Sequence, residues 1–475
     1  MSQIDAQVIS EATLKAAQAR PHGAYTAGLA RYAAAFSYER VPAEVRDFAR
    51  GIVLDTLGAM VAASSGRYGL RGTLGSFVTQ SGGTPESTLF GLGTKSSMVN
   101  AALYNGTLGY YCDIEAHHPG AIMHGPAIVV PAALAAAEAR GASGEEVLAA
   151  VVLGVDVACR VSYAIDPNAL YARAFHPTAV CGAFGAAAAV GRIVGLSAEQ
   201  MANAFGLTAN QASGLLAWAS DHTEQSRPFN PGLAARNGTT AALLAEAGMG
   251  APQNVLDPAE KYNVFRAWSV QPRPEELLDR LYERFFITEL AVKLYACCAF
   301  LHPALDGILA LLEEQAVAAE DVEAITLRFS HSGRSMIDQN ELKSHRAQYI
   351  LPIGLYNQRV VLDDILFEPR DTRIATLSER VRVVGDDELE RFYPDRYPSI
   401  VELTTRDGSV ASRRVDWPKG YPQNPVSQTD LERKFRDLAA TALDGAAIDR
   451  LVDLAAGLER LPRVAEVLAL VARTE

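Results

Sequence analysis

The long run of small and apolar residues between positions 24 and 255 most constrains how this chain can fold. In segment 41–66 the apolar side chains recur at close to helical spacing. Ser143 and Ser197 each begin a capping box, and each box is followed by an apolar helix pattern. Between them, segment 182–190 has small faces that let two helices approach closely. The pattern predicts a large domain of closely packed helices.

The second part of the chain has a different residue pattern. Residues Val322–Ser330 alternate apolar or β-branched side chains with polar ones, which predicts a strand. Segment Ser399–Trp417 predicts a hairpin that turns at Asp407 and Gly408. Between these strands, Ser344–Asn357 predicts an amphipathic helix. We therefore expect a smaller domain that mixes helices and strands.

Helical patterning returns near the C-terminal end, where Ser427 and Asp430 form a capping signal. The predicted fold class is therefore mainly α. We expect an all-helical domain made of residues 1–275 and 426–475, and a smaller α+β lid domain made of residues 276–425.

Charge and cysteine content narrow the functional classes. The 43 basic and 55 acidic residues give a formal net charge of −12, which argues against a nucleic-acid partner or an anionic membrane surface. An anionic substrate can still bind in a local basic pocket. The five cysteines have neither CxxC nor zinc-ligand spacing, which suits reduced thiols. Adjacent Cys297 and Cys298 are interpreted as small buried hydrophobic residues.

Nothing in the sequence predicts targeting or membrane insertion. The first 25 residues contain acidic side chains and have no apolar core of a signal peptide. The strongest apolar runs, Val147–Val155 and Ala186–Val190, are shorter than the roughly 20 residues that a bilayer requires. We expect a soluble, cytoplasmic protein without a membrane partner.

The segment from Asn105 to Pro131 is the richest in groups that carry chemistry. It is a loop broken by glycine and proline that contains two carboxylates and three imidazoles: Asp113, Glu115, His117, His118 and His124. Histidine is the side chain best suited to move protons near neutral pH. A small-residue apolar helix follows, so the loop is predicted to form an active-site floor on a packed scaffold.

Metal binding is the main rival interpretation of this loop. Asp113, His117 and His124 provide two histidines and a carboxylate, the ligand set of non-haem iron sites. Against it, the spacing is irregular and no i, i+4 histidine pair on a helix sets the geometry. We therefore predict no metal.

Three further segments place candidate site residues far from this loop. His176 precedes a proline at a predicted helix start, where free backbone N–H groups favour an anion; the alternative is a capped core histidine. Arg227 can clamp a carboxylate, although arginines beside proline are more often surface residues. Lys293 lies in an apolar stretch, where an unpaired ammonium is costly.

Taken together, these segments resemble the MmgE/PrpD family, which includes 2-methylcitrate dehydratase, cis-aconitate decarboxylase and iminodisuccinate epimerase. The likeness extends over nearly the whole chain, in the family's order. The segments that carry it are Leu54–Gly58, the loop from Asp113 to His124, Phe175–Thr178, Gly232–Gly238, Cys297–Asp306, and the PKGYPQNP motif followed by Lys434 and Phe435.

The resemblance implies a helical domain with an α+β lid, a homodimer, no cofactor, and a small di- or tricarboxylate bound between the domains. By position, Asp113, His124 and His176 match the family's active-site aspartate and histidines, and Lys293 matches the lysine of the lid segment. His117 and His118 are further catalytic candidates. Asn105 is a candidate for hydrogen bonding to the substrate.

Two positions depart from the family pattern. Decarboxylase and epimerase members usually have Lys-Pro-x-His where this chain has Arg227-Pro-Phe-Asn230, and the decarboxylases have a histidine at Cys298. Arginine keeps a carboxylate clamp but does not transfer protons. His331 or Tyr349 from the lid is expected to supply a replacement donor.

The family's reactions share a proton transfer at a carbon α to a carboxylate, with or without loss of a β group. We expect Arg227 and Lys293 to bind substrate carboxylates, and His124 and His176 to act as base and acid in either order. Asp113 is expected to orient a histidine. The predicted activity is that of a dehydratase-like lyase; the alternatives are an epimerase or racemase, a decarboxylase, and a non-enzymatic carboxylate-binding protein.

Overall fold

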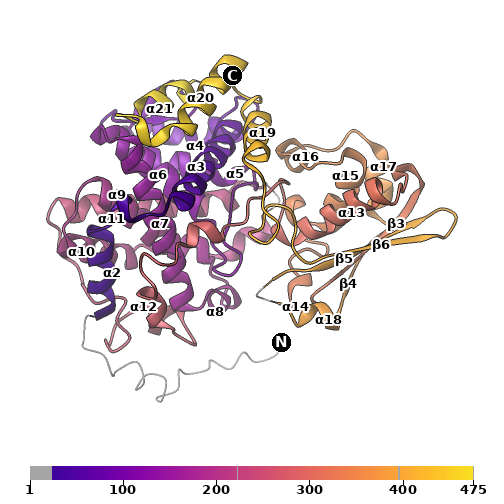
Figure 1. The fold of residues 1–475 in the computed structure, drawn as a ribbon, viewed down its shortest axis with the longest axis horizontal. Coiled ribbons are helices and arrows are strands. Elements are labelled where there is room, and N and C mark those ends of the chain that lie inside the picture. Colours follow the sequence, from indigo (N-terminus) through magenta and orange to yellow (C-terminus); the bar gives the residue numbers. More distant parts are fainter. Residues whose placement is uncertain (1–23, 222, 394–395, 474–475) are drawn as a thin grey trace.

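The computed structural model describes residues 24–221, 223–393 and 396–473. Helices account for 58% of it and strands for 9%, which confirms the mainly α fold class. A large helical domain carries the N-terminal half of the chain, and a smaller domain with a sheet projects from its side (Figure 1).

The helical domain is built from helices of very different lengths. In chain order they are α2 (Ala24–Ala34), α3 (Ala43–Ala63), α4 (Gly69–Gln80), α5 (Met98–Tyr111), α6 (Gly125–Arg140), α7 (Gly144–Ile165), α8 (Pro167–Ala172), α9 (Pro177–Ile193), α10 (Ala198–Ala209), α11 (Ser226–Glu246) and α12 (Val264–Trp268). The predicted capping boxes at Ser143 and Ser197 both form, at the starts of α7 and α10. A two-stranded hairpin, β1 (Ser87–Leu89) with β2 (Thr94–Ser96), interrupts the helices and was not predicted.

Close helix packing at the centre of this domain depends on glycine. Helix α9 packs against α7 and α11. A Cβ atom at Gly185 would lie 2.5 Å from the carbonyl oxygen of Gly154 on α7, and one at Gly182 would lie 2.3 Å from Ile128 on α6. The small faces predicted for segment 182–190 therefore lie at these crossings.

Helix α7 is the longest apolar helix of the core. Its 22 residues are long and apolar enough to cross a membrane, although the apolar run predicted within it is shorter. Of its most apolar window, 94% is buried inside the protein. Its composition is thus that of a central core helix surrounded by other helices.

The lid is a four-stranded sheet with helices. The strand order is β4 (Val381–Gly385), β3 (Val322–Phe329), β5 (Ser399–Thr405), β6 (Val410–Val415). Strand β3 pairs in parallel with β4 and antiparallel with β5, and β5 and β6 form the predicted hairpin. Helix α13 (His302–Glu314) packs on β5 and β6.

The remaining lid helices lie around this sheet (Figure 1). They are α14 (His331–Arg334), α15 (Ala347–Asn357), α16 (Leu362–Leu366), α17 (Thr372–Ser378) and α18 (Asp387–Glu390). Helix α15 begins three residues later than the predicted Ser344–Asn357, because the 3₁₀ turn η7 (Lys343–His345) precedes it.

The chain then returns to the helical domain through α19 (Gln428–Ala439), α20 (Gly445–Ala456) and α21 (Ala465–Val471). Helix α19 packs on α3. The ammonium of Lys434 on α19 lies 2.5 Å from Asp55 on α3 and donates a 2.7 Å hydrogen bond to the carbonyl oxygen of Ile114. A C-terminal helix thereby holds the backbone of the histidine-rich loop.

Residues just after the predicted domain boundary at 275/276 also contact the helical domain. Arg160 on α7 donates hydrogen bonds to the carbonyl oxygens of Glu276 and Asp279, and the amide of Phe286 contacts Asp156, also on α7. The segment that leads to the lid therefore runs along α7.

Candidate active site

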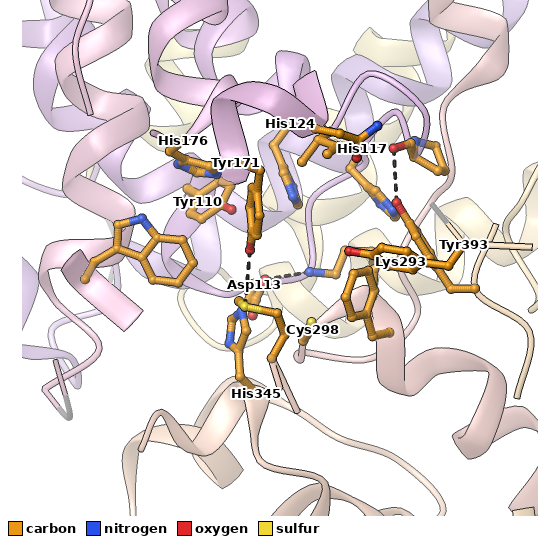
Figure 2. A pocket seen from close by; sticks show the side chains of 18 residues that line it. Tyr110, Asp113, His117, His124, Tyr171, His176, Lys293, Cys298, His345 and Tyr393 are labelled. Carbon is orange, nitrogen blue, oxygen red and sulfur yellow. Dashed lines mark hydrogen bonds and ion pairs between the residues drawn. The ribbon is translucent and has the colours of Figure 1, made fainter. Parts of the chain in front are cut away.

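A cavity lies where the loop between α5 and α6 meets the lid. It encloses about 740 Å³ of space free of protein atoms, part of it open to solvent. Figure 2 shows His117, His124 and His176 entering from one side and His345 from the other. Of the predicted catalytic residues, the structure brings Asp113, His117, His124 and His176 to this cavity, together with Lys293.

Asp113 and Lys293 form a buried ion pair in the cavity wall. Asp113 directly follows α5 and Cys112, and its φ of 50° lies in the left-handed region, which costs energy for a non-glycine residue. The Lys293 ammonium lies 2.5 Å from Asp113 Oδ1. Burial disfavours both charged forms, but the neighbouring opposite charges outweigh it. Arg227 and Lys293 hold the pKa of Asp113 well below its usual range. Asp113 in turn raises the pKa of Lys293.

Glu115, rather than Asp113, is the carboxylate next to His124. The Nδ1 atom of His124 lies 2.8 Å from Glu115 Oε1, and Glu115 is completely buried. Asp113, which was expected to orient a histidine, pairs with Lys293, and its charge also acts on His345. Glu115 therefore places a buried negative charge beside Nδ1 of His124.

His117 stacks on His124, with ring centroids 5.2 Å apart and an interplanar angle of 23°. The backbone of His117 exchanges two hydrogen bonds with Ala291, two residues before Lys293. Burial, reinforced by the charges of His124 and Lys293, lowers the pKa of His117 well below its usual range. His117 is therefore a neutral imidazole at neutral pH.

His176 is the N-cap residue of α9, as its position before Pro177 predicted. Its ring packs edge-on against Trp218, and its amide donates to the carbonyl oxygen of Gly214. The hydroxyl of Thr178, in the first turn of α9, accepts from the amide of His124, so the two histidine-bearing segments are joined. Burial lowers the pKa of His176 to about 3.

His345 was not predicted from the sequence as a site residue. It lies in η7 of the lid, lines the cavity, and contacts the hydroxyl of Ser344 through Nδ1 at 2.9 Å. Burial lowers its pKa to about 4, although Asp113 opposes that shift. Neither His331 nor Tyr349, the expected lid donors, lines the cavity: His331 is exposed beside Asp387, and the Tyr349 hydroxyl donates to the carbonyl oxygen of Asp364.

Arg227 lies behind the cavity wall rather than in it. Its side chain is completely buried and donates to the carbonyl oxygens of Tyr110 and Tyr111, and it pairs with Glu224 at 3.3 Å and with Asp113 at 3.5 Å. The predicted carboxylate clamp is therefore corrected, because in this structure the guanidinium holds Asp113 and the end of α5.

His118 and Asn105 are also displaced from the predicted site. His118 accepts from the amide of Ala121 and lies 3.3 Å from Glu289. Asn105 accepts from the amide of Phe90 and donates to the carbonyl oxygen of Thr88, so its amide holds the β1–β2 hairpin on α5. Both residues have structural partners and do not line the cavity.

The rival ligand set of Asp113, His117 and His124 does not form a metal-binding cluster. Among residues 24–221, 223–393 and 396–473, no group of three His, Cys, Asp or Glu side chains has a suitable arrangement. Asp113 is engaged by Lys293, and His124 by Glu115. The arrangement instead suits acid–base chemistry, with one carboxylate-supported imidazole, neutral imidazoles around it and one ammonium.

Two family models match the chain. The MmgE/PrpD N-terminal domain matches residues 27–276, and the MmgE/PrpD C-terminal domain matches residues 295–459. The gap between them contains the segment that crosses from the helical domain to the lid.

Curated relatives align over most of their length. The chain is 25% identical over 488 residues to a cis-aconitate decarboxylase of Aspergillus terreus, covering 96% of this chain and 98% of the relative. It is 26% identical to a cis-aconitate decarboxylase-like protein of Aspergillus oryzae, with 95% and 98% covered. It is 28% identical over 386 residues to the human cis-aconitate decarboxylase, with 76% of each chain covered. Since the two models together match well over half of its residues, in the order that the two domains follow, the chain belongs to the MmgE/PrpD family.

Proposed function

We propose that this protein is a lyase that removes a proton from a carbon α to a carboxylate of a small di- or tricarboxylic acid and eliminates a β group. One observation carries the proposal: His124, which lies beside Glu115, lines one cavity together with three further histidines and Lys293. The cis-aconitate decarboxylases among the relatives support a lyase.

Each residue has a proposed role. Lys293, kept protonated by Asp113, binds the substrate carboxylate. His124 is the base, because Glu115 stabilises the imidazolium that forms when Nε2 takes the proton. His176 stays neutral and donates a hydrogen bond to the oxyanion of the enolate, as a neutral imidazole with a depressed pKa can. In a dehydration, the proton on His124 then passes to the departing hydroxyl, which leaves as water.

Decarboxylation is the second candidate, favoured by the names of the relatives. In that reaction the C–C bond to a carboxylate breaks, CO₂ leaves, and the carbanion takes a proton from the imidazolium. Epimerisation needs the same proton transfer without a leaving group.

Proton NMR in deuterated water tests the proposal and separates these reactions. Incubation with β-hydroxy acids should give a new alkene signal, and incubation with unsaturated tricarboxylates tests for CO₂ release with deuterium at the new C–H. Exchange with inversion and no new alkene would indicate an epimerase. Binding of every acid without exchange, elimination or CO₂ release would refute the lyase.

Three expectations from the sequence belong with this proposal. We propose that activity needs no cofactor or metal, so that dialysis against a chelator leaves turnover unchanged. We propose a homodimer, so that light scattering gives twice 50.8 kDa. We also propose a cytoplasmic location, which fractionation of the source cells tests.

A further inference from the structure

The cavity lining contains two chemically different sets of residues, and their difference bears on the substrate. The first set, which we call the histidine end, comprises the histidines and the Asp113–Lys293 pair. Lys293 is the only lysine or arginine among the described residues that line the cavity, since Arg227 lies behind the wall. The positive charge available to a ligand is therefore small.

The buried charges around the histidine end leave no positive charge to spare. Asp113, Glu115 and Glu224 contribute three carboxylates, against the two cations Arg227 and Lys293. Glu115 is next to His124, so even a protonated His124 only balances this cluster. A buried carboxylate without a cationic partner is costly. Each carboxylate that a ligand brings adds unmatched negative charge, so a ligand with fewer carboxylates is favoured over one with three.

The second set of lining residues, which we call the apolar end, is apolar and aromatic. The rings of Phe300, Tyr393 and Tyr397 form a cluster in which the Phe300 and Tyr397 centroids are 4.4 Å apart. The Tyr397 hydroxyl donates to the carbonyl oxygen of Pro119, and the Tyr171 hydroxyl faces the sulfur of Met336 at 3.7 Å. Phe300, Met336, Tyr393 and Tyr397 come from the lid, and together with Tyr171 they line the cavity.

We propose that the substrate carries one or two carboxylates at the histidine end and an apolar substituent that packs against Tyr171, Phe300 and Met336. One carboxylate pairs with Lys293, and imidazole N–H groups donate to a second. The apolar substituent replaces the third carboxylate of a tricarboxylic acid. This inference rests on the proposed function, because it assigns the ligand of the same cavity.

Three unreactive acids with one shared core test the proposal by calorimetry. Succinate is the core, 2-butylsuccinate adds an apolar chain, and tricarballylate adds a third carboxylate. None has a leaving group, so the result depends on binding alone. We expect 2-butylsuccinate to bind at least about tenfold more tightly than either of the others, because the butyl chain is removed from water. Tricarballylate binding as tightly as 2-butylsuccinate, or no binding of 2-butylsuccinate, would overturn the proposal.

A matched pair of variants adds a test at the apolar end. Met336→Lys places an ammonium there, so it should reverse the preference in favour of tricarballylate, whereas Met336→Leu should keep it. Thermal melts show whether both variants fold. If Met336→Lys does not fold, the binding of the three acids to the unaltered protein alone decides whether the proposal holds. If Met336→Lys folds and its preference among the three acids is unchanged, Met336 does not contact the apolar substituent as proposed.

The two proposals fail in different ways. If no acid is turned over but 2-butylsuccinate binds as expected, the lyase is refuted and the ligand class stands. If a tricarboxylate is turned over and binds best, the lyase stands and only the ligand class falls.

Discussion

At the scale of single residues, the site depends on how each carboxylate is assigned to a partner. Glu115 lies beside His124, and Asp113 lies between Lys293 and Arg227. Two carboxylates only two positions apart thus have different partners: Glu115 is next to the proposed base His124, and Asp113 is next to the ammonium of Lys293. Asp113 has a positive φ, and it lies at the point in the chain where the two carboxylates go to different partners.

Replacing Glu115 by glutamine should slow turnover with little loss of folding. The amide keeps the shape of the carboxylate but removes the charge that stabilises protonated His124, so we expect kcat to fall by about 10²-fold. Steady-state kinetics with the substrate found by NMR measures this. His331→Ala is the control, because that exposed lid histidine does not line the cavity. Equal kinetics in Glu115→Gln and the unaltered protein would remove Glu115 from the mechanism.

The buried neutral histidines should make stability depend on pH. Burial lowers the pKa of His345 to about 4 and that of His176 to about 3, whereas both titrate near 6.5 in an unfolded chain. As pH falls below 6.5, the unfolded state takes up protons that the folded state does not, so stability is lost down to about pH 4 for His345 and pH 3 for His176. The loss is at most about 1.4 kcal/mol per pH unit for each histidine.

Urea unfolding at pH 7.5 and pH 5.0 checks this sign. The drop in unfolding free energy should be smaller by about 2 kcal/mol in His345→Gln than in the unaltered protein, because one titrating group is removed. An equal drop in His345→Gln would mean that His345 titrates normally in the folded state.

At the scale of elements, α19 connects the end of the chain to the floor of the site. Lys434 neutralises Asp55 on α3 and holds the carbonyl oxygen of Ile114, which lies between Asp113 and Glu115. Burial raises the pKa of Asp55 and Lys434 opposes that shift, so the pair is stable only as long as both partners are present.

Lys434→Met should destabilise the protein strongly. It leaves Asp55 buried without a cation, which costs about 3–5 kcal/mol, and it frees the Ile114 carbonyl, so turnover should fall as well. Adding Asp55→Asn should recover part of the unfolding free energy but not the turnover. Lys419→Met, which removes an exposed lysine 4.0 Å from Asp430, should change stability by less than about 1 kcal/mol. A double variant no more stable than Lys434→Met would refute this pairing.

Local signals explain which elements the sequence predicted. The capping boxes at Ser143 and Ser197, and the hairpin turn at Asp407, are encoded within a few residues, and all three form. Strand β4 was missed because it pairs in parallel with β3, more than fifty residues earlier, without a turn signal.

Residues of the candidate site were likewise predictable where a local motif marks them. His124 and His176 stand in recognisable motifs before helices, and both line the cavity. His345 has no such motif, and only the packing of the lid brings it there. Arg227 carries a motif, but whether a guanidinium faces the cavity or the carbonyl oxygens behind it depends on tertiary packing.

At the scale of the whole molecule, one buried contact joins the lid to the helical domain next to the site. Glu224 accepts hydrogen bonds from the amide and hydroxyl of Ser344, and it pairs with Arg227. Since Ser344 precedes His345, this contact fixes where the lid histidine enters the cavity.

Ser344→Ala should weaken this contact while leaving each domain folded. We expect kcat/KM to fall about tenfold, because His345 is positioned less well when one hydrogen bond to a buried carboxylate is lost. Steady-state kinetics and a thermal melt measure the two effects. Ser412→Ala, at an exposed position of β6, should change neither. A large drop in melting temperature with unchanged kcat/KM would show that the contact serves folding alone.

The anchoring of Ile114 by Lys434 has a consequence for synthesis of the protein. These residues are separated by 320 positions in the chain, so the loop gains this support only after α19 has been synthesised. A nascent chain with α19 still inside the exit tunnel of the ribosome should already contain most of the helical domain but no working site. Activity would then arise only after α19 has left the tunnel.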